Sequence, residues 1–183
     1  MRIISGSARG TNLFTLDGLT TRPTLDRVKE SLFNIIQGRV EDATVLDLFA
    51  GSGAIGIECL SRRAEKAYFC DKSKDAVKMI EKNLEKTRLK EKAVIYNKDY
   101  IDCINTVSNQ KFDIIFLDPP YKEEFALDAI ERMSELKLLK DEGIIIIETD
   151  EPKRDIERIN KMNINYKMYD LRKYGRVSLI FLK

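Results

Sequence analysis

The sequence predicts an α/β fold built on a mostly parallel sheet, and two observations carry this prediction. From residue 44 onward, short apolar segments alternate with amphipathic stretches, a pattern typical of successive strand-helix-strand units. A glycine-rich turn follows the first of these segments, at the place where parallel sheets bind their ligands. The 183 residues suffice for one such domain with a modest extension.

An N-terminal extension is expected ahead of this domain. Residues 2–16 resemble a small hairpin that turns at Arg9 and Gly10 and forms a basic, exposed ribbon. A helix follows it, and the strand-helix alternation begins soon after that helix. We therefore divide the chain into an extension, residues 1–38, and a main domain, residues 39–183.

Two of the predicted helices have recognisable ends. In residues 24–38, Thr24 is the expected N-cap, an apolar stripe recurs at helical spacing, and Gly38 follows the last turn. In residues 73–89, Ser73 is the expected N-cap and apolar residues again recur near helical spacing. Both segments should therefore lay one apolar face on the sheet.

Five apolar segments should form the parallel strands, and two more should complete the sheet. The five are residues 44–50, 66–71, 93–99, 111–118 and 143–150. After a helix at residues 152–160, residues 165–174 and 176–183 alternate like two strands, with Gly175 at the bend. Such a pair closes a parallel sheet with an antiparallel edge.

Composition excludes several classes of chemistry. The chain has no histidine, so Ser-His-Asp hydrolysis and histidine-ligated zinc are excluded, and no metal site is expected. The three cysteines, Cys59, Cys70 and Cys103, lack metal-ligand spacing and read as small buried hydrophobic residues. No apolar run approaches the length of a membrane helix, and the N-terminus lacks a secretory signal, so a cytoplasmic location is expected.

Charge is distributed unevenly along the chain. Residues 1–40 carry six Lys/Arg and three Asp/Glu, and residues 151–183 carry nine and four. The central residues 41–150 carry 17 and 23. Basic ends around an acidic centre favour a polyanion bound by the ends, although solvated surface lysines are the alternative.

The glycine-rich turn indicates a nucleotide-type cofactor. Gly51, Gly53 and Gly56 form a G-x-G-x-x-G pattern between a strand and a helix, where the backbone can approach a ligand closely. Both dinucleotides and S-adenosylmethionine (SAM) use this device. Asp71, at the end of the second strand, suits the ribose of either cofactor. Asp47 favours SAM, because a carboxylate attracts the ammonium and sulfonium charges but repels a pyrophosphate.

Four aspartates lie within or at the ends of the first four predicted strands. They are Asp47, Asp71, Asp99 and Asp118. Because the carboxyl ends of parallel strands meet at one edge of a sheet, these side chains should line one crevice. Any one of them, Asp99 in particular, could instead cap the helix that follows.

The fourth strand ends on Asp118-Pro119-Pro120-Tyr121, which suggests amine chemistry. The two prolines restrict the backbone to a stiff, extended corner whose carbonyls cannot pair with a neighbouring strand. Those carbonyls and the Asp118 carboxylate could accept hydrogen bonds from an NH2 group and orient it toward a methyl donor. Tyr121 offers a flat face for a nucleobase. The alternative is a helix-capping aspartate, a proline turn and a packed tyrosine.

Taken together, "DLFAGSGAIGIECLSRRA" and "DIIFLDPPY" resemble class I SAM-dependent amino-methyltransferases. The segments "RIISGSARG" and "TRPTLDRVKESLFNII" resemble the bacterial 16S rRNA (guanine(966)-N(2))-methyltransferase family, and the similarity covers essentially the whole chain. The resemblance implies a seven-stranded Rossmann-like sheet with an N-terminal hairpin. It also implies methyl transfer to a guanine amine of 16S rRNA in the assembling small ribosomal subunit.

The resemblance also assigns roles to individual residues. Cofactor binding falls to Thr24, Asp47, Phe49, Gly51, Gly53, Asp71 and Asp99, and the guanine amine to residues 118–121. The segment around Thr24, Arg27 and Phe33 would close over cofactor or RNA, although an amphipathic helix also explains Phe33 as a core residue. The chain departs from the family in two places: Asp71 stands where glutamate is frequent, and residues 173–183 match only loosely.

RNA contacts are expected from the basic segments at the two ends. The candidates are Arg2, Arg9, Arg22, Arg27, Lys173 and Arg176. Other acceptors stay open, namely adenine N6 of a nucleic acid and a protein glutamine. A nicotinamide-dependent oxidoreductase is disfavoured by Asp47, and a non-catalytic RNA-binding module by the intact residues 118–121. A monomer is expected.

Overall fold

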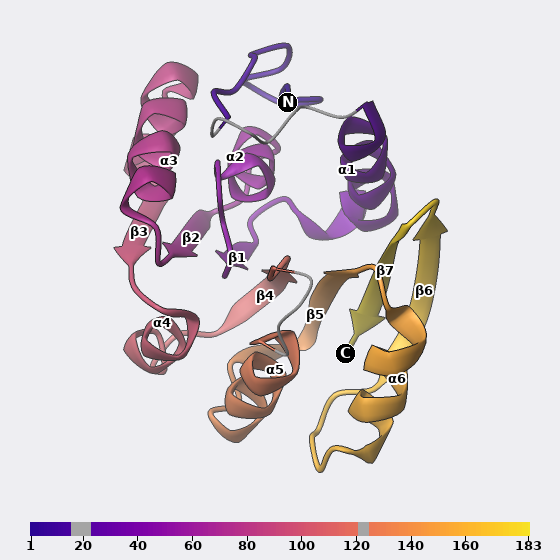
Figure 1. The fold of residues 1–183 in the computed structure, drawn as a ribbon. Helices are drawn as coiled ribbons and strands as arrows, with labels where there is room; N and C mark the ends of the chain where they lie inside the picture. The colour runs from indigo at the N-terminus through magenta and orange to yellow at the C-terminus, as the bar shows by residue number, and fades with distance from the viewer. Residues whose placement is uncertain (16–22, 121–124) are drawn as a thin grey trace.

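Seven strands form one sheet in the order β3-β2-β1-β4-β5-β7-β6 (Figure 1). The computed structural model describes residues 1–15, 23–120 and 125–183. Strands β1 to β5 pair in parallel, whereas β7 pairs antiparallel with both β5 and β6. The predicted mostly parallel sheet with an antiparallel C-terminal strand is therefore confirmed. The strands are β1 (Thr44–Asp47), β2 (Lys66–Asp71), β3 (Ala93–Asn97), β4 (Phe112–Leu117), β5 (Leu139–Thr149), β6 (Met168–Tyr174) and β7 (Val177–Leu182).

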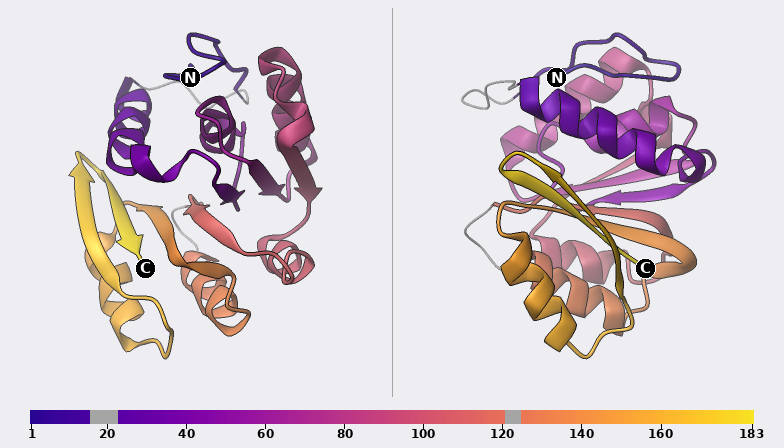
Figure 2. Two further views of the ribbon diagram at one scale, coloured as in Figure 1. Left: turned by 180° about the vertical axis from the view of Figure 1, so that it is seen from behind. Right: turned by 90° about the vertical axis from the view of Figure 1, so that its right-hand side faces the viewer.

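Helices cover both faces of the sheet. One core cluster joins α1, α2 and α3 to one face, and a second joins α4, α5 and α6 to the other, as Figures 1 and 2 show. None of the helices in the described residues is long and apolar enough to cross a membrane. The α-helices are α1 (Pro23–Ile36), α2 (Ala54–Ser61), α3 (Lys74–Thr87), α4 (Tyr100–Thr106), α5 (Phe125–Glu135) and α6 (Pro152–Lys161), and η1 (Gln37–Arg39) and η2 (Lys90–Lys92) are short 3-10 turns.

Local sequence signals explain most of these elements. The Ser73 hydroxyl accepts a hydrogen bond from the Ala76 amide at 3.3 Å, which confirms the predicted cap of α3. Strand β1 ends at Asp47, earlier than predicted. The chain then bonds to the adjacent strands: the Leu48 amide donates to the Phe116 carbonyl of β4, and the Ala50 amide donates to the Cys70 carbonyl of β2. The three cysteines are buried, as expected.

The N-terminal segment differs from the expected exposed ribbon. Within residues 1–15, which the structure describes, it has one isolated bridge, between Arg2 and Asn12, and no strand. The side chains of Ile3, Ala8 and Leu13 are buried in the same cluster as α1 and α2, because this short segment gains more from covering α2 than from pairing with itself. The segment is therefore part of the core.

The helix after this segment starts one residue earlier than predicted. Helix α1 begins at Pro23, so Thr24 lies in its first turn and not at the N-cap. Proline at the first helical position is favourable, because its missing N–H would have no partner there.

Glu58 of α2 holds the N-terminal segment and α1 together. Its fully buried carboxylate accepts hydrogen bonds from the amides of Ile4 and Ser5 at 2.8 and 3.0 Å. It also forms ion pairs with Lys29 of α1 at 3.2 Å and with Arg62 at 2.8 Å. Burial lowers the pKa of Lys29, and the Glu58 carboxylate opposes this shift. Glu58 therefore satisfies donors from three parts of the chain.

We expect Glu58→Gln to lower the free energy of unfolding by about 3 kcal/mol, because it leaves the Lys29 ammonium buried without a carboxylate. Urea unfolding followed by circular dichroism measures the effect. Glu85→Gln is the matched control, since Glu85 pairs with Lys90 at 2.9 Å on the exposed surface and such pairs contribute at most about 1 kcal/mol. Equal losses from the two variants would contradict this role of Glu58.

Candidate active site

The strand register gathers acids at the carboxyl edge of the sheet. Asp47 at the end of β1 is in register with Phe69 of β2 and Phe116 of β4. Asp71 lies two residues after Phe69 along the chain, and Asp118 lies two residues after Phe116. Because side chains two residues apart in a strand share a face, all three acids lie on the face covered by α1, α2 and α3.

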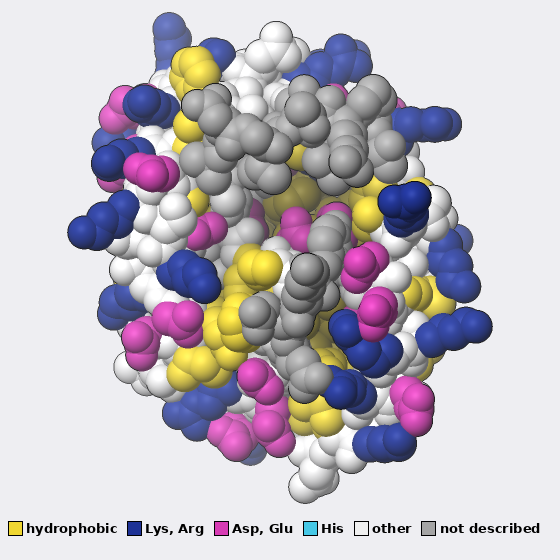
Figure 3. Space-filling view, in the orientation of Figure 1, with side chains coloured by type: hydrophobic (Ala, Val, Ile, Leu, Met, Phe, Trp, Pro, Cys, Tyr) yellow, Lys and Arg dark blue, Asp and Glu magenta, His cyan; other side chains and the backbone are white. Residues whose placement is uncertain are grey.

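The carboxyl end of β4 lies near the centre of the view in Figure 1. In the same orientation, Figure 3 shows acidic side chains in a hollow there, with lysine and arginine side chains mostly around the periphery. An acidic hollow suits a cationic or hydrogen-bond-donating ligand.

The glycine-rich turn leaves open space above the start of α2. Gly51 and Gly53 have φ angles of 53° and 77°, a backbone conformation that favours glycine, and Gly53 is the N-cap of α2. A Cβ atom at Gly51 would meet nothing within 4 Å, whereas one at Gly56 would lie 2.3 Å from the Phe69 ring. The first glycine thus gives access to a ligand, and the third lets α2 pack closely on β2.

Asp47 is a buried carboxylate with one hydrogen bond from the helix. Its side chain is 2% exposed, and its Oδ2 accepts from the Gly56 amide at 3.1 Å. Burial raises the pKa of Asp47 to about 7; the hydrogen bond from Gly56 opposes this shift, and the charge of Asp71 adds to it. A carboxylate in this state gains most from a positively charged ligand nearby.

Asp71 fixes the glycine-rich turn. Its two oxygens accept from the Gly51 amide at 2.9 Å and from the Ser73 amide at 2.8 Å, which ties the turn to the end of β2. Asp99 is exposed and accepts from the Ile101 amide at 3.2 Å as the N-cap of α4, so the capping alternative holds for this residue. Each carboxylate has further lone pairs for a ligand.

An aromatic row stands beside these acids. The Phe49 ring lies 5.5 Å from that of Tyr100, which lies 4.9 Å from that of Phe125. The row runs from the end of β1 to α4 and α5. It provides an apolar wall for a planar ring next to the carboxylates.

The proline corner places Asp118 at the end of β4. Asp118 is half-buried, Pro119 is buried and Pro120 is exposed. Burial raises the pKa of Asp118 well above its ordinary value, and the charges of Glu148 and Asp47 raise it further. Tyr121 lies outside the described residues.

The predicted phosphate contacts fall into two groups. Lys173 and Arg176 are exposed near the turn between β6 and β7. This turn reaches the carboxyl edge, because Ser178 pairs with Thr149 at the end of β5. Arg27 is exposed on α1, whose first half lies beside α2 through the Lys29–Glu58 ion pair.

The other predicted contacts lie elsewhere. Arg9 belongs to a loop held at the far end of α2 from the glycine-rich turn, where the Ser7 amide donates to the Ser61 carbonyl at 2.8 Å. Arg2 is exposed, and its backbone carbonyl accepts a hydrogen bond from the Lys29 ammonium of α1 at 2.6 Å. Arg22 lies outside the described residues, and the side chain of Thr24 is not described.

Two residues at this site were not singled out from the sequence. Glu148 lies at the end of β5 and is 8% exposed. Asn83 of α3 is fully buried, accepts from the Phe14 amide at 2.8 Å, and donates to the carbonyls of Phe14 and Ser52 at 3.0 and 2.9 Å. In both cases, the sequence signal is a polar residue within an otherwise apolar strand or apolar helix face.

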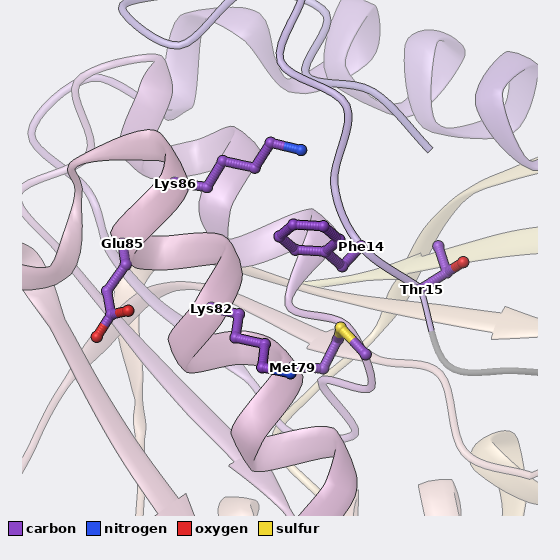
Figure 4. A pocket seen from close by; sticks show the side chains of 6 residues that line it. All are labelled: Phe14, Thr15, Met79, Lys82, Glu85 and Lys86. Atoms are coloured by element: carbon purple, nitrogen blue, oxygen red, sulfur yellow. The ribbon is translucent and has the colours of Figure 1, made fainter.

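A shallow hollow of about 610 Å³ lies beside the segment that Asn83 holds (Figure 4). Its lining includes Phe14, whose ring is 47% exposed, and Lys82 and Lys86 of α3. The Lys86 ammonium lies 4.2 Å from the Phe14 ring centroid. The hollow combines an aromatic ring with two lysines and the acid Glu85, and none of the four candidate aspartates lines it.

The chain is similar to known proteins over most of its length. A family described as Conserved hypothetical protein 95 matches residues 1–183. Ribosomal RNA small subunit methyltransferase D of Haemophilus influenzae is 39% identical over 155 residues, which cover 84% of this chain and 80% of that protein. The protein of the same name from Escherichia coli K12 is 34% identical over 150 residues, which cover 82% and 75%.

Solved structures agree with the fold. A protein from Escherichia coli described as a methyltransferase has a TM-score of 0.80 at 30% identity, covering 100% of this chain and 96% of that chain. A methyltransferase fold complexed with S-adenosylhomocysteine has a TM-score of 0.74 at 21% identity, covering 94% and 53%. The chain belongs to the Conserved hypothetical protein 95 family and is a relative of ribosomal RNA small subunit methyltransferase D.

Proposed function

We propose that this protein transfers a methyl group from SAM to the exocyclic N2 amine of a guanine in 16S rRNA. It is a SAM-dependent rRNA methyltransferase, as its relatives are by name. The observation that carries the finer proposal is the Asp118-Pro119-Pro120 corner, which ends β4 on the same face and at the same edge as Asp47 and the glycine-rich turn.

The residues around the glycine-rich turn fit SAM. When bound, SAM supplies a methyl group on a positively charged sulfur. The buried Asp47 carboxylate, with its raised pKa, is suited to hold the positive charges. Gly51 leaves room for the methionine end next to Gly53, Asp71 can accept from the ribose, and Asp99 with the Phe49 row can hold the adenine. Thr24 would lie across the cofactor.

The proline corner can orient an amine that is a poor nucleophile. The Asp118 carboxylate and the backbone carbonyls of the corner accept both N–H groups, which turns the nitrogen lone pair toward the methyl donor. Asp118 can then accept the proton that the methylated amine loses. Its raised pKa makes it a better base than an ordinary carboxylate. Tyr121 would stack on the base.

The basic residues in the two end segments of the chain support an RNA substrate. Arg27, Lys173 and Arg176 lie near the carboxyl edge and would contact phosphates there, with Arg2, Arg9 and Arg22 as more distant candidates. We expect the protein to act in the cytoplasm as a monomer on the assembling small subunit.

The acceptor can be mapped directly. The protein is incubated with labelled SAM and small subunits from a strain that lacks the homologous enzyme, and labelled nucleosides are then identified by mass spectrometry. We expect label on N2 of one guanine of 16S rRNA. Label on adenine N6 or on a protein glutamine would overturn the acceptor assignment.

We expect Asp118→Ala to lower methyl transfer at least 100-fold, because it removes both an amine acceptor and the proton acceptor. The affinity for SAM, measured by calorimetry, should stay within about threefold of the wild type, since Asp118 belongs to the acceptor side of the crevice. Asp141→Ala is the control, because Asp141 is an exposed acid in the first half of β5. Loss of SAM binding in a folded Asp118→Ala variant would contradict this division of roles.

SAM affinity should depend on pH through Asp47. Because its pKa in the free protein is about 7, Asp47 is mostly neutral at pH 5.5, and we expect SAM to bind on the order of tenfold more weakly there than at pH 7.5. In Asp47→Asn the affinity should be low and nearly constant over this range. Calorimetry at three pH values provides the measurement, and an equal slope in both proteins would rule out Asp47 as the titrating group.

Asp47 should also make the free energy of unfolding depend on pH, in the direction opposite to that of SAM affinity. A carboxyl whose pKa is raised on folding contributes stability below its unfolded pKa and loses it as the pH rises through about 7. The unliganded wild type should therefore lose stability relative to Asp47→Asn between pH 4 and pH 7.5.

A further inference from the structure

Glu148 is an acid that the mechanism above does not use. It follows Ile144, Ile145, Ile146 and Ile147 at the end of β5 and is 8% exposed. Its place near the end of β5 puts this acid at the carboxyl edge of the sheet, at the level of the candidate site.

The register places Glu148 beside Asp118. Ile147 of β5 pairs with Leu117 of β4, so the next residues, Glu148 and Asp118, come side by side at the ends of two adjacent parallel strands. Neighbouring strands lie about 4.8 Å apart. Phe116 lies two residues before Asp118 and Ile146 lies two residues before Glu148, and both belong to the core cluster under α1, α2 and α3. The two acids therefore lie on that face.

The surroundings of Glu148 are apolar on its other side. It pairs there with Leu179 of β7, which is fully buried in that core cluster. The next residue, Thr149, is held in place because its hydroxyl bonds the Asp155 carboxylate at 2.6 Å and accepts from the Glu151 amide at 3.0 Å. The backbone of Glu148 is therefore fixed, and Asp118 lies on its polar side.

We propose that Glu148 selects guanine by accepting a hydrogen bond from its N1–H, while Asp118 and the proline corner accept from the N2 amine. This inference rests on the proposed function and assigns the base specificity of the same site. Guanine presents two adjacent donors, N1–H and N2–H2, along its Watson–Crick edge. Adenine presents its N6 amine next to an N1 lone pair, which a Glu148 carboxylate would repel.

Charge explains why two adjacent acids suit guanine. Two carboxylates at this spacing disfavour each other's ionised form, and the Glu148 charge is the largest charge acting on Asp118. Two N–H donors on one planar edge stabilise both charges at once. A base with a single donor would leave one carboxylate unpaired in a buried site, which is the condition under which enzymes reject a substrate analogue most strongly.

The test uses small subunits reconstituted with 16S rRNA that carries guanine or 2-aminopurine at the methylated position. 2-Aminopurine keeps the N2 amine but has a lone pair at N1 in place of N1–H. We expect the wild type to prefer guanine by at least about 100-fold in kcat/KM. Comparable rates on the two bases would overturn the inference without any variant being needed.

Glu148→Gln extends the test, because a carboxamide can donate to the N1 lone pair of 2-aminopurine. We expect kcat/KM on guanine to fall about 100-fold, and the preference for guanine over 2-aminopurine to fall at least tenfold, with SAM affinity unchanged. Glu142→Gln is the matched control, because Glu142 is an exposed glutamate earlier in β5, and this variant should keep the wild-type preference.

The outcomes separate the two proposals. If the wild type methylates guanine N2 and folded Glu148→Gln keeps the wild-type preference, this inference fails and the proposed function stands. If the wild type labels no guanine in either substrate, both fail.

Discussion

The parallel register of β2, β1, β4 and β5 is the constraint on which the rest of the site depends. It brings Asp71, Asp47, Asp118 and Glu148 to one edge and one face, although they are far apart in the sequence. The fold compensates these charges unequally. Asp71 accepts two backbone amides, whereas Asp47 and Asp118 keep raised pKa values. Asp47 is assigned to the cation and Asp118 to the base, and their charges are the least compensated by the fold. Ligand binding would therefore relieve the free-energy cost of burying these two carboxylates.

The N-terminal segment is bound to the same face by buried polar groups. Glu58 holds its first residues and α1 against the middle of α2, and Asn83 joins Phe14 to the glycine-rich turn through Ser52. Hydrogen bonds of this kind fix one arrangement, because any unpaired member would be buried without water. Asn83 therefore connects the glycine-rich turn directly to Phe14 of the N-terminal segment.

Much of this arrangement could be predicted from the sequence because its signals are local. Residues 66–71 form β2 as predicted, Ser73 caps α3, and the glycine pattern precedes α2. Tertiary contacts decided the rest. The N-terminal hairpin became a core segment because α2 offers it apolar surface, and this could not be read from its own residues. Glu148 was overlooked because only the pairing of β4 with β5 shows that it neighbours Asp118. The roles of Tyr121 and Arg22 stay predictions.

The charges of Asp47 and Asp118 connect the two halves of the crevice. Asp47 raises the pKa of Asp118, so a cation that balances Asp47 favours the ionised form of Asp118, which is the form that accepts hydrogen bonds from an amine. Methyl transfer would move the sulfonium charge onto the amine beside Asp118, and in the proposed mechanism Asp118 would then accept the proton that this amine loses. The spacing of the acids would thus couple the charge of the donor to the protonation of Asp118.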